Sequence, residues 1–247
     1  MRFNLSEIEL SRNDLRRDIN LPKETSGDLA EFWGIMTGDG FANYYKENED
    51  YMLAIAGHKK HDYDYHSNYI RPLILKLFRI TPSFYIAKNQ ETLYTTLRSK
   101  ALITFLSEYG FPLGKKVNIR IPNWIYEKDE YMSAFLRGLA DTDFSLTFKN
   151  KGHGHNYPVI RAAFKGKLLV KGVEGILESF GISFNSQYDI REFSKQTGKY
   201  YTKSHIYICG KKNLELWMKY IDFKNDNHLK KFYYWQTNGV YPPHLLD

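Results

Sequence analysis

The sequence has a single cysteine among its 247 residues, which excludes an internal disulfide framework and a zinc site built on cysteine ligands. No apolar run approaches the roughly 18 residues that cross a bilayer. The N-terminal segment MRFNLSEIELSRNDLRRD has no apolar core for a signal peptide. With only 8 prolines and 43% hydrophobic residues, the composition is not that of a disordered chain. We therefore expect a soluble cytoplasmic protein without membrane contact. A prokaryotic or archaeal source fits, and an organelle-encoded protein would look similar.

Positive charge is in excess. Lys and Arg number 35 against 28 Asp and Glu, which gives a formal net charge of +7, and the chain carries 20 Tyr and 16 Phe. A basic surface favours a polyanionic partner such as nucleic acid, but charge alone does not identify one.

Two stretches share one pattern of small residues. The first is LAEFWGIMTGDG, residues 29–40, and the second is SAFLRGLADTDF, residues 133–144. Small residues recur every fourth position among apolar ones, which predicts a helix with a ridge that permits close backbone approach. Each stretch then ends in an acid, Asp39 or Asp143. The small residues of the two copies are Ala30, Gly34 and Gly38, and Ala134, Gly138 and Thr142, at a constant offset of 104 positions (30 and 134, 34 and 138).

Two further matches follow in the same order, 71–80 with 173–182 and 99–111 with 211–223. Three ordered matches indicate a duplicated unit. We predict an α+β protein with an N-terminal extension over 1–25, a first unit over 26–111, a linker over 112–127 and a second unit with a C-terminal helix over 128–247. Each unit is expected to run helix, two strands, helix, two strands, helix. The expected strands are 39–46, 51–58, 81–87 and 92–98, then 144–149, 158–165, 184–193 and 200–209.

The two acids have a plain interpretation and a chemical one. Taken alone, Asp39 followed by Gly40 could merely end a helix and begin a turn. If the two small-residue helices pack together as a twofold pair, however, Asp39 and Asp143 meet at their C-terminal ends. Two carboxylates there repel each other and the helix dipole unless a cation lies between them. Mg²⁺ binds one or two carboxylates with waters and phosphate oxygens, and such a site can hydrolyse a phosphodiester.

At these residues the sequence resembles a known family. MTGDG after FWGI, and GLADTD after FLR, look like the two motifs of a single-chain LAGLIDADG homing endonuclease, and the resemblance covers residues 26–223. It implies two αββαββα halves related by a pseudo-dyad, each with a curved antiparallel sheet facing DNA. It also implies cleavage of both strands across the minor groove of a long asymmetric target, leaving 3′ overhangs, by a monomer that needs no partner chain.

The resemblance implies a metal site as well. Its ligands would be Asp39 and Asp143, with Gly38 and Thr142 beside them, and its cation would be Mg²⁺, with Mn²⁺ or Ca²⁺ able to substitute in binding. Asp141 is expected to have a structural role at its helix end.

One position departs from the family pattern, because Phe144 stands where the first copy has Gly40. Glycine there permits positive φ or close backbone approach to phosphate, which Phe tolerates poorly. We expect an active enzyme, since intact acids in both motifs argue for catalysis. The alternatives are a catalytically impaired DNA-binding relative, a transcription regulator without cleavage, and an intron maturase that holds its host intron RNA.

Basic groups near the ends of the second strands are candidates for contact with the scissile phosphates. They are His58 and Lys59 in the first unit and Lys165 and Lys167 in the second. We expect His58 and Lys165 to act in catalysis, Lys165 by stabilising negative charge that develops on the phosphate. The alternative is that Lys165 is one surface lysine among many. The histidines lack the spacing of a zinc hydrolase, and His61 and His66 are expected at the surface or as capping groups.

Strand-borne polar and aromatic side chains are expected to read the bases of double-stranded DNA, with phosphates supplying most of the salt-dependent affinity. Only one parity of each strand can face the groove. The candidates are Asn43, Tyr45, Lys46, Lys59, Tyr85, Lys88, Thr96 and Arg98 in the first unit, and Thr147, Lys149, Arg161, Lys167, Gln187, Asp189, Arg191 and Tyr207 in the second.

Overall fold

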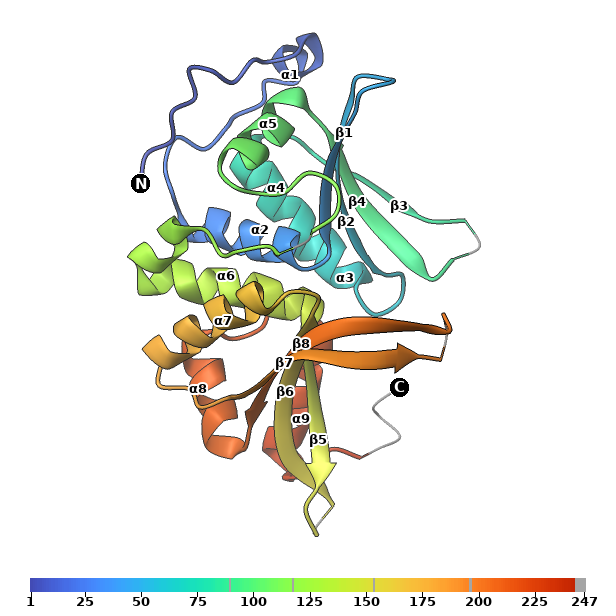
Figure 1. The fold of residues 1–247 in the computed structure, drawn as a ribbon, viewed down its shortest axis with the longest axis vertical. Coiled ribbons are helices and arrows are strands. Elements are labelled where there is room, and N and C mark those ends of the chain that lie inside the picture. The colour runs from blue at the N-terminus through green and yellow to red at the C-terminus, as the bar shows by residue number, and fades with distance from the viewer. Residues whose placement is uncertain (89, 117, 153, 196, 243–247) are drawn as a thin grey trace. The chain divides into compact units, whose positions relative to one another are not determined.

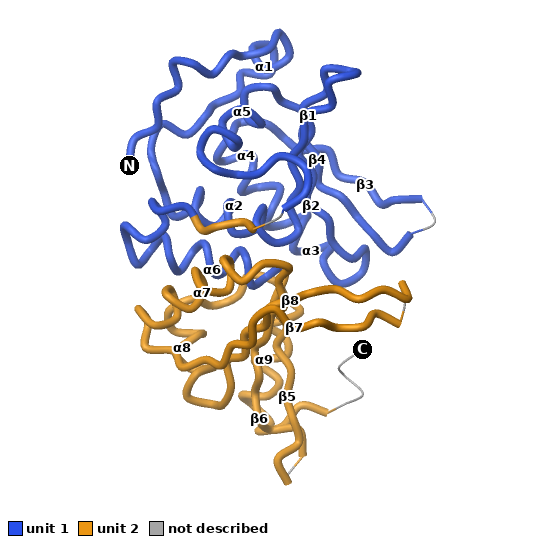
Figure 2. Tube along the Cα trace, viewed as in Figure 1, with its two compact units in different colours: residues 1–116, 122–142 blue, residues 117–121, 143–247 orange. Residues whose placement is uncertain are grey.

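The computed structural model of the chain describes residues 1–88, 90–116, 118–152, 154–195 and 197–242. Its contacts divide the chain into two compact units (Figure 2). The first comprises residues 1–116 and 122–142, and the second comprises residues 117–121 and 143–247. The units are therefore not bounded as the repeats are, because the helix over the second motif belongs to the first unit. In the part of the chain that the structure describes, every helix is too short or too polar to cross a bilayer.

The first unit contains a four-stranded antiparallel sheet with strand order β1-β2-β4-β3, and helices cover one of its faces (Figure 1). Its strands are β1 (Gly40–Tyr45), β2 (Asp50–His58), β3 (Ser83–Ile86) and β4 (Thr92–Arg98). Its helices are α1 (Arg12–Arg16), α2 (Gly27–Thr37), α3 (Tyr63–Tyr65), a π-helical turn (His66–Ile70), α4 (Arg71–Phe78), α5 (Lys100–Glu108), a 3₁₀ turn (Asn123–Glu127) and α6 (Asp129–Asp143), whose last residue falls in the second unit.

The second unit repeats the architecture, with strand order β5-β6-β8-β7. This confirms the predicted α+β class and the antiparallel sheets. Observed strand ends lie within three residues of the predicted ones. The elements are β5 (Ser145–Asn150), β6 (His155–Phe164), α7 (Lys167–Ser179), β7 (Asn185–Ser194), β8 (Lys199–Cys209), α8 (Lys211–Tyr220) and α9 (Asp226–Asn238). The predicted C-terminal helix, α9, packs on β5 through Trp235, whose ring stacks on Phe148 with centroids 5.5 Å apart.

The two motif helices cross at their glycines, as the small-residue ridges predict. A Cβ added to Gly34 would lie 2.0 Å from the carbonyl oxygen of Phe135, and one added to Gly138 would lie 2.2 Å from that of Glu31. At the start of the helices, a Cβ on Gly27 would lie 2.5 Å from Glu130 Oε1. The first turn of α2 thus contacts the first turn of α6, and the middle of each helix contacts the middle of the other. The two helices therefore run parallel, and their C-terminal ends point the same way.

A buried ion pair also joins these helices. Arg137 on α6 donates from Nε to Glu31 Oε1 at 3.0 Å and from Nη2 to Oε2 at 2.6 Å. The hydroxyl of Tyr69 donates to Glu31 Oε1 at 2.7 Å, and Glu31 is only 3% exposed. The two-oxygen geometry and the extra donor satisfy a carboxylate that burial would otherwise destabilise.

Phe144 fills the core of the second unit. It is 4% exposed, its ring lies 5.7 Å from that of Trp217 and 5.9 Å from that of Phe164, and its φ is not positive. Gly40, at the equivalent position, does not have positive φ either; a Cβ there would lie 2.4 Å from the Cα of Met36. Glycine in the first copy thus serves close packing on α2, and the second copy has room for an aromatic ring.

The N-terminal extension packs into the first unit. Phe3 is buried against Phe105 and Tyr109, with ring centroids 5.1 and 4.5 Å away. Buried Asp14 on α1 accepts from the backbone N–H of Ala101 at 3.2 Å, in the first turn of α5. Residues outside the repeat therefore complete the core and cap a helix of the first unit.

Candidate nucleic-acid interface and acid pair

The two motif acids each stand where a motif helix ends. Gly38 caps α2 by donating its N–H to the carbonyl of Gly34 at 3.0 Å, and Asp39 lies between that cap and the start of β1. The backbone carbonyl of Asp39 accepts from the N–H of Ala56 at 3.1 Å, which fixes it to β2. Asp143 is the last residue of α6. Helix ends and strand starts, not loops, position both backbones.

Threonine hydroxyls bond carbonyls in the last turns of both motif helices, and in α2 the Thr37 hydroxyl donates to the carbonyl of Trp33 at 2.8 Å. At the end of α6, the Thr142 hydroxyl donates toward the carbonyls of Leu139, at 2.9 Å, and Gly138, at 3.2 Å. At the end of α2, the ammonium of Lys116 lies among three backbone carbonyls, donating to Thr37 O at 2.9 Å, to Met36 O at 3.3 Å and to Gly38 O. Sequence reasoning did not find Lys116, which lies in the linker between the repeats.

The motif residues carry the oxygen ligands that hard divalent cations bind. Carboxylate and carbonyl oxygens are the ligands that Mg²⁺ and Ca²⁺ prefer, and Mg²⁺ uses few protein groups and keeps waters. Within the described residues, no group of three or more His, Cys, Asp and Glu side chains could hold a metal.

The outer face of the first sheet carries most of the predicted reading residues of that unit. Leu53 and Leu97 point to the core from β2 and β4, whereas the pairing of Asn43 with Met52 and of Met52 with Arg98 places these residues on the other face. By strand parity, the same outer face carries Tyr45, Tyr85 and Thr96, although Thr96 is only 6% exposed. Two further candidates, Lys46 and Lys88, lie in the turns after β1 and β3.

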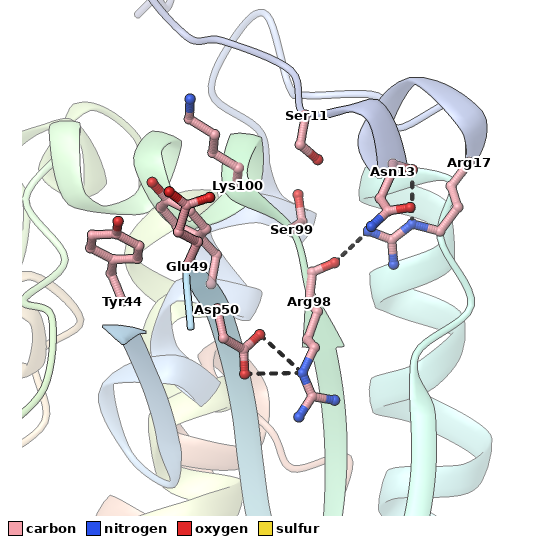
Figure 3. A pocket seen from close by; sticks show the side chains of 10 residues that line it. Ser11, Asn13, Arg17, Tyr44, Glu49, Asp50, Arg98, Ser99 and Lys100 are labelled. Atoms are coloured by element: carbon pink, nitrogen blue, oxygen red, sulfur yellow. Dashed lines mark hydrogen bonds and ion pairs between the residues drawn. The ribbon is translucent and has the colours of Figure 1, made fainter. Parts of the chain in front are cut away.

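Arg98 has a defined arrangement on this face. Its Nε donates to both carboxylate oxygens of Asp50, at 3.0 and 3.2 Å, and its backbone carbonyl accepts from Arg17 of the N-terminal extension (Figure 3). Arg17, Asp50 and Arg98 line a pocket of about 410 Å³ together with Lys100 and six other residues. Among the described residues, no side chain accepts a hydrogen bond from the two terminal nitrogens of Arg98, Nη1 and Nη2. Asp50 thus holds the guanidinium while leaving its bidentate end available.

The second sheet divides the candidates between its faces. Arg161 pairs with Tyr207, and strand parity puts Thr147, Lys149 and Gln187 on the same outer face. The register of β7 shifts between Gln187 and Ile190. After this bulge Arg191 pairs with Thr202 and has the opposite parity; its guanidinium lies 4.2 Å from the centroid of the Tyr200 ring. Asp189, inside the bulge, has φ of 54° and lies 3.7 Å from the ammonium of Lys167.

Comparison with known proteins accords with this geometry. Residues 130–222 match the model of a LAGLIDADG-like domain. Crystal structures of the homing endonuclease I-DmoI with DNA and Mn, and with DNA and Ca, superpose with TM-scores of 0.53 each. The identities are 17% and 16%, each match covers 79% of this chain, and it covers 96% and 88% of the respective I-DmoI chains. The chain has the LAGLIDADG fold. A variant of I-DmoI with its target DNA and Mg matches similarly, with a TM-score of 0.52, 16% identity, and coverage of 79% of this chain and 95% of that one. No curated protein matches the chain.

The basic candidates take different positions within their own units. His58 ends β2 as predicted, and its ring Nδ1 accepts from the N–H of Lys60 at 3.2 Å. Lys59 pairs with Glu91 at 2.7 Å. Lys165 is exposed just after β6, but Lys167 does not end that strand, because it begins α7. The strand ends earlier than predicted because Gly166 forms the N-cap of α7.

His66 corrects a prediction. Expected at the surface or as a cap, it is 1% exposed in the π-helical turn, and its Nδ1 lies 2.9 Å from Thr95 Oγ1. Burial lowers the pKa of His66 to about 4, so the ring is neutral near neutral pH. Its Nε2 would lie 2.5 Å from a Cβ on Gly57, so the imidazole packs directly beneath the sheet.

Sequence reasoning also missed the polar cluster at the LAGLIDADG helices. Glu31 and Arg137 each interrupt an apolar stretch, and that interruption was the available signal. Asp141 is 3% exposed in the last turn of α6, in keeping with the structural role expected of it. Burial and the nearby charges of Asp141 and Glu31 raise the pKa of Tyr65, so this hydroxyl stays neutral.

Proposed function

We propose that the protein is a site-specific, divalent-cation-dependent endonuclease that cleaves both strands of a long asymmetric DNA target across the minor groove and leaves 3′ overhangs. The observation that carries this proposal is the glycine crossing of the parallel helices α2 and α6: Asp39 directly follows the C-cap of α2, and Asp143 is the last residue of α6. A module that only binds has no need for a carboxylate at the end of each crossed helix. The proposal includes action as a monomer, since one chain supplies both acids.

Asp39 and Asp143 would hold the cation, with Gly38 and Thr142 forming the adjoining backbone. Bound Mg²⁺ would lower the pKa of the attacking water and stabilise the leaving oxygen, and Mn²⁺ or Ca²⁺ would substitute in binding. The side chain of Lys165 would donate to the phosphate that carries developing charge. His58 would donate a hydrogen bond to the phosphate from its ring Nε2, because Nδ1 accepts from backbone N–H groups and the ring proton therefore lies on Nε2.

Recognition of the bases would fall to the outer faces of the two sheets. Arg98 and Arg161 offer bidentate donors suited to guanine, and Asn43 and Gln187 suit adenine. Each sheet also offers exposed lysines for phosphate contacts, which make affinity fall with salt.

The decisive experiment uses a plasmid that carries the host locus without the insertion. With Mg²⁺, the wild-type protein should linearise this plasmid. Asp39→Asn and Asp143→Asn should abolish double-strand cleavage while DNA binding persists. Asp18→Asn is a matched control, because Asp18 is exposed on the N-terminal extension and pairs only loosely with Arg79 at 3.6 Å; it should cut as wild type does. Wild-type cleavage by both motif variants would refute the site. Tight binding by wild type without nicking or cleavage would refute the endonuclease and favour a binding role, with host intron RNA tested in the same binding assay.

A further inference from the structure

One lysine of the linker, Lys116, contacts the C-terminal end of the first motif helix, α2. Lys116 is half-buried, and its ammonium donates to the carbonyls of Met36, Thr37 and Gly38. An ammonium has three donors and no acceptor, so three converging carbonyls match its hydrogen-bonding capacity. Carbonyls in the last turn of a helix lack intrahelical partners, and the linker supplies one here.

The path of the linker explains how Lys116 reaches this place. The order β1-β2-β4-β3 leaves β1 at the sheet edge with unpaired backbone groups. Gly114, with φ of 77°, donates its N–H to the carbonyl of Ala42 on β1 at 2.7 Å. The linker is thereby fixed to β1 two residues before Lys116. Lys115, between them, is exposed to solvent.

The electrostatic situation gives the contact its significance. The C-terminal end of a helix carries about half a negative charge, and Asp39 directly follows Gly38. A carboxylate at this end is destabilised unless a cation offsets it. The ammonium of Lys116 is such a cation, it belongs to the chain itself, and it arrives from outside both repeats.

We propose that Lys116 is a positioning residue for the first motif acid: it clamps the Gly38 turn that orients Asp39 and supplies the countercharge there before a divalent cation binds. The countercharge part rests on the proposed function, since it assumes that Asp39 is a cation ligand. The clamp part does not, because it requires only the three carbonyl contacts.

The test compares Lys116→Met with Lys115→Met, which removes a neighbouring exposed lysine and the same formal charge. In thermal unfolding without divalent cations or DNA, Lys116→Met should melt lower than Lys115→Met. Added Ca²⁺ should then raise the melting temperature of Lys116→Met more than that of the control. Its half-saturating Ca²⁺ concentration should be about two- to fivefold lower, as expected for removing one positive charge near a helix terminus. Lys116→Arg should restore the control response to Ca²⁺, and Asp39→Asn in the Lys116→Met background should abolish the enhanced response.

Equal melting of Lys116→Met and Lys115→Met without metal would overturn the clamp. Lower melting with an unchanged Ca²⁺ response would overturn the countercharge and leave only a structural contact. None of these readouts needs cleavage, so a protein that fails to cut DNA but shows the expected shifts would refute the endonuclease proposal without refuting this one.

Discussion

The glycine crossing allows a sharp prediction for Gly34→Ala. The new Cβ would lie 2.0 Å from the Phe135 carbonyl oxygen and 2.8 Å from the Leu139 nitrogen, both of them backbone atoms that cannot rotate away. Ordinary contact needs about 3.4 Å, so the helices must separate by roughly 1.4 Å or tilt. Such overpacking costs about 1–3 kcal/mol and occasionally more, against a gain of up to about 1 kcal/mol from the helix propensity of Ala.

We therefore expect Gly34→Ala to lose about 2 kcal/mol of unfolding free energy, measured by urea denaturation. Gly175→Ala is the matched control, because Gly175 lies inside α7 and a Cβ there meets nothing within 4 Å. This control should be stabilised by up to about 1 kcal/mol. The cleavage rate of Gly34→Ala should also fall, and by more than the loss of folded protein explains, since the acids lie at the ends of the displaced helices. The reasoning is refuted if the two alanine variants are equally stable.

Three other perturbations have expected outcomes. Phe144→Gly should lower the unfolding free energy by at least about 3–5 kcal/mol through the cavity it leaves, without a gain in cleavage, as measured by urea denaturation and plasmid cleavage. The pKa of His66 lies below its unfolded value near 6.5, so the unfolded state binds the extra proton; stability should fall as pH drops from 6.5 to about 4, by up to about 3 kcal/mol, and His66→Gln should flatten this part of the denaturation profile. Asp50→Asn should weaken the preference for one base in a selection on randomised targets by about tenfold, whereas Arg98→Met should abolish it.

Each of these has an opposite result that would count against it. A large gain in cleavage by Phe144→Gly would mean that the second motif is impaired by its phenylalanine. Parallel pH profiles for wild type and His66→Gln would mean that other groups govern acid stability. An unchanged base preference in both sheet variants would remove Arg98 from the reading surface.

The sequence predicted those features that depend on short-range pattern. The spacing of Gly34 and Gly138 within apolar helices predicted the close crossing, because only glycine lets two backbones meet. Strand alternation predicted that only one parity of each strand faces outward, and Asn43 and Arg161 have that parity in the structure. Arg191 could not be placed, because a bulge changes strand parity without a clear mark in the sequence. The correct predictions thus rest on regular spacing along a helix or strand, and the prediction for Arg191 failed where the strand is irregular.

Features that depend on the path of a loop were not predictable. Lys116 is one of two adjacent lysines, and only the attachment of Gly114 to β1 selects which one meets α2. His66 lies in a segment rich in tyrosine and histidine, and its burial follows from how the π-helical turn packs under the sheet. The burial of Phe144 was not predictable either, because it depends on the rings of Phe164 and Trp217, which pack beside it in the core of the second unit.

The lysine from the linker limits how symmetric this duplicated molecule can be. A chain with two repeats has only one linker between them, and here the Lys116 ammonium of that linker contacts the end of α2. Separating the repeats into two identical subunits would duplicate the sheets and the acids but would remove the linker that carries this lysine. The position of Lys116 therefore belongs to the connection between the repeats and not to the repeated unit itself.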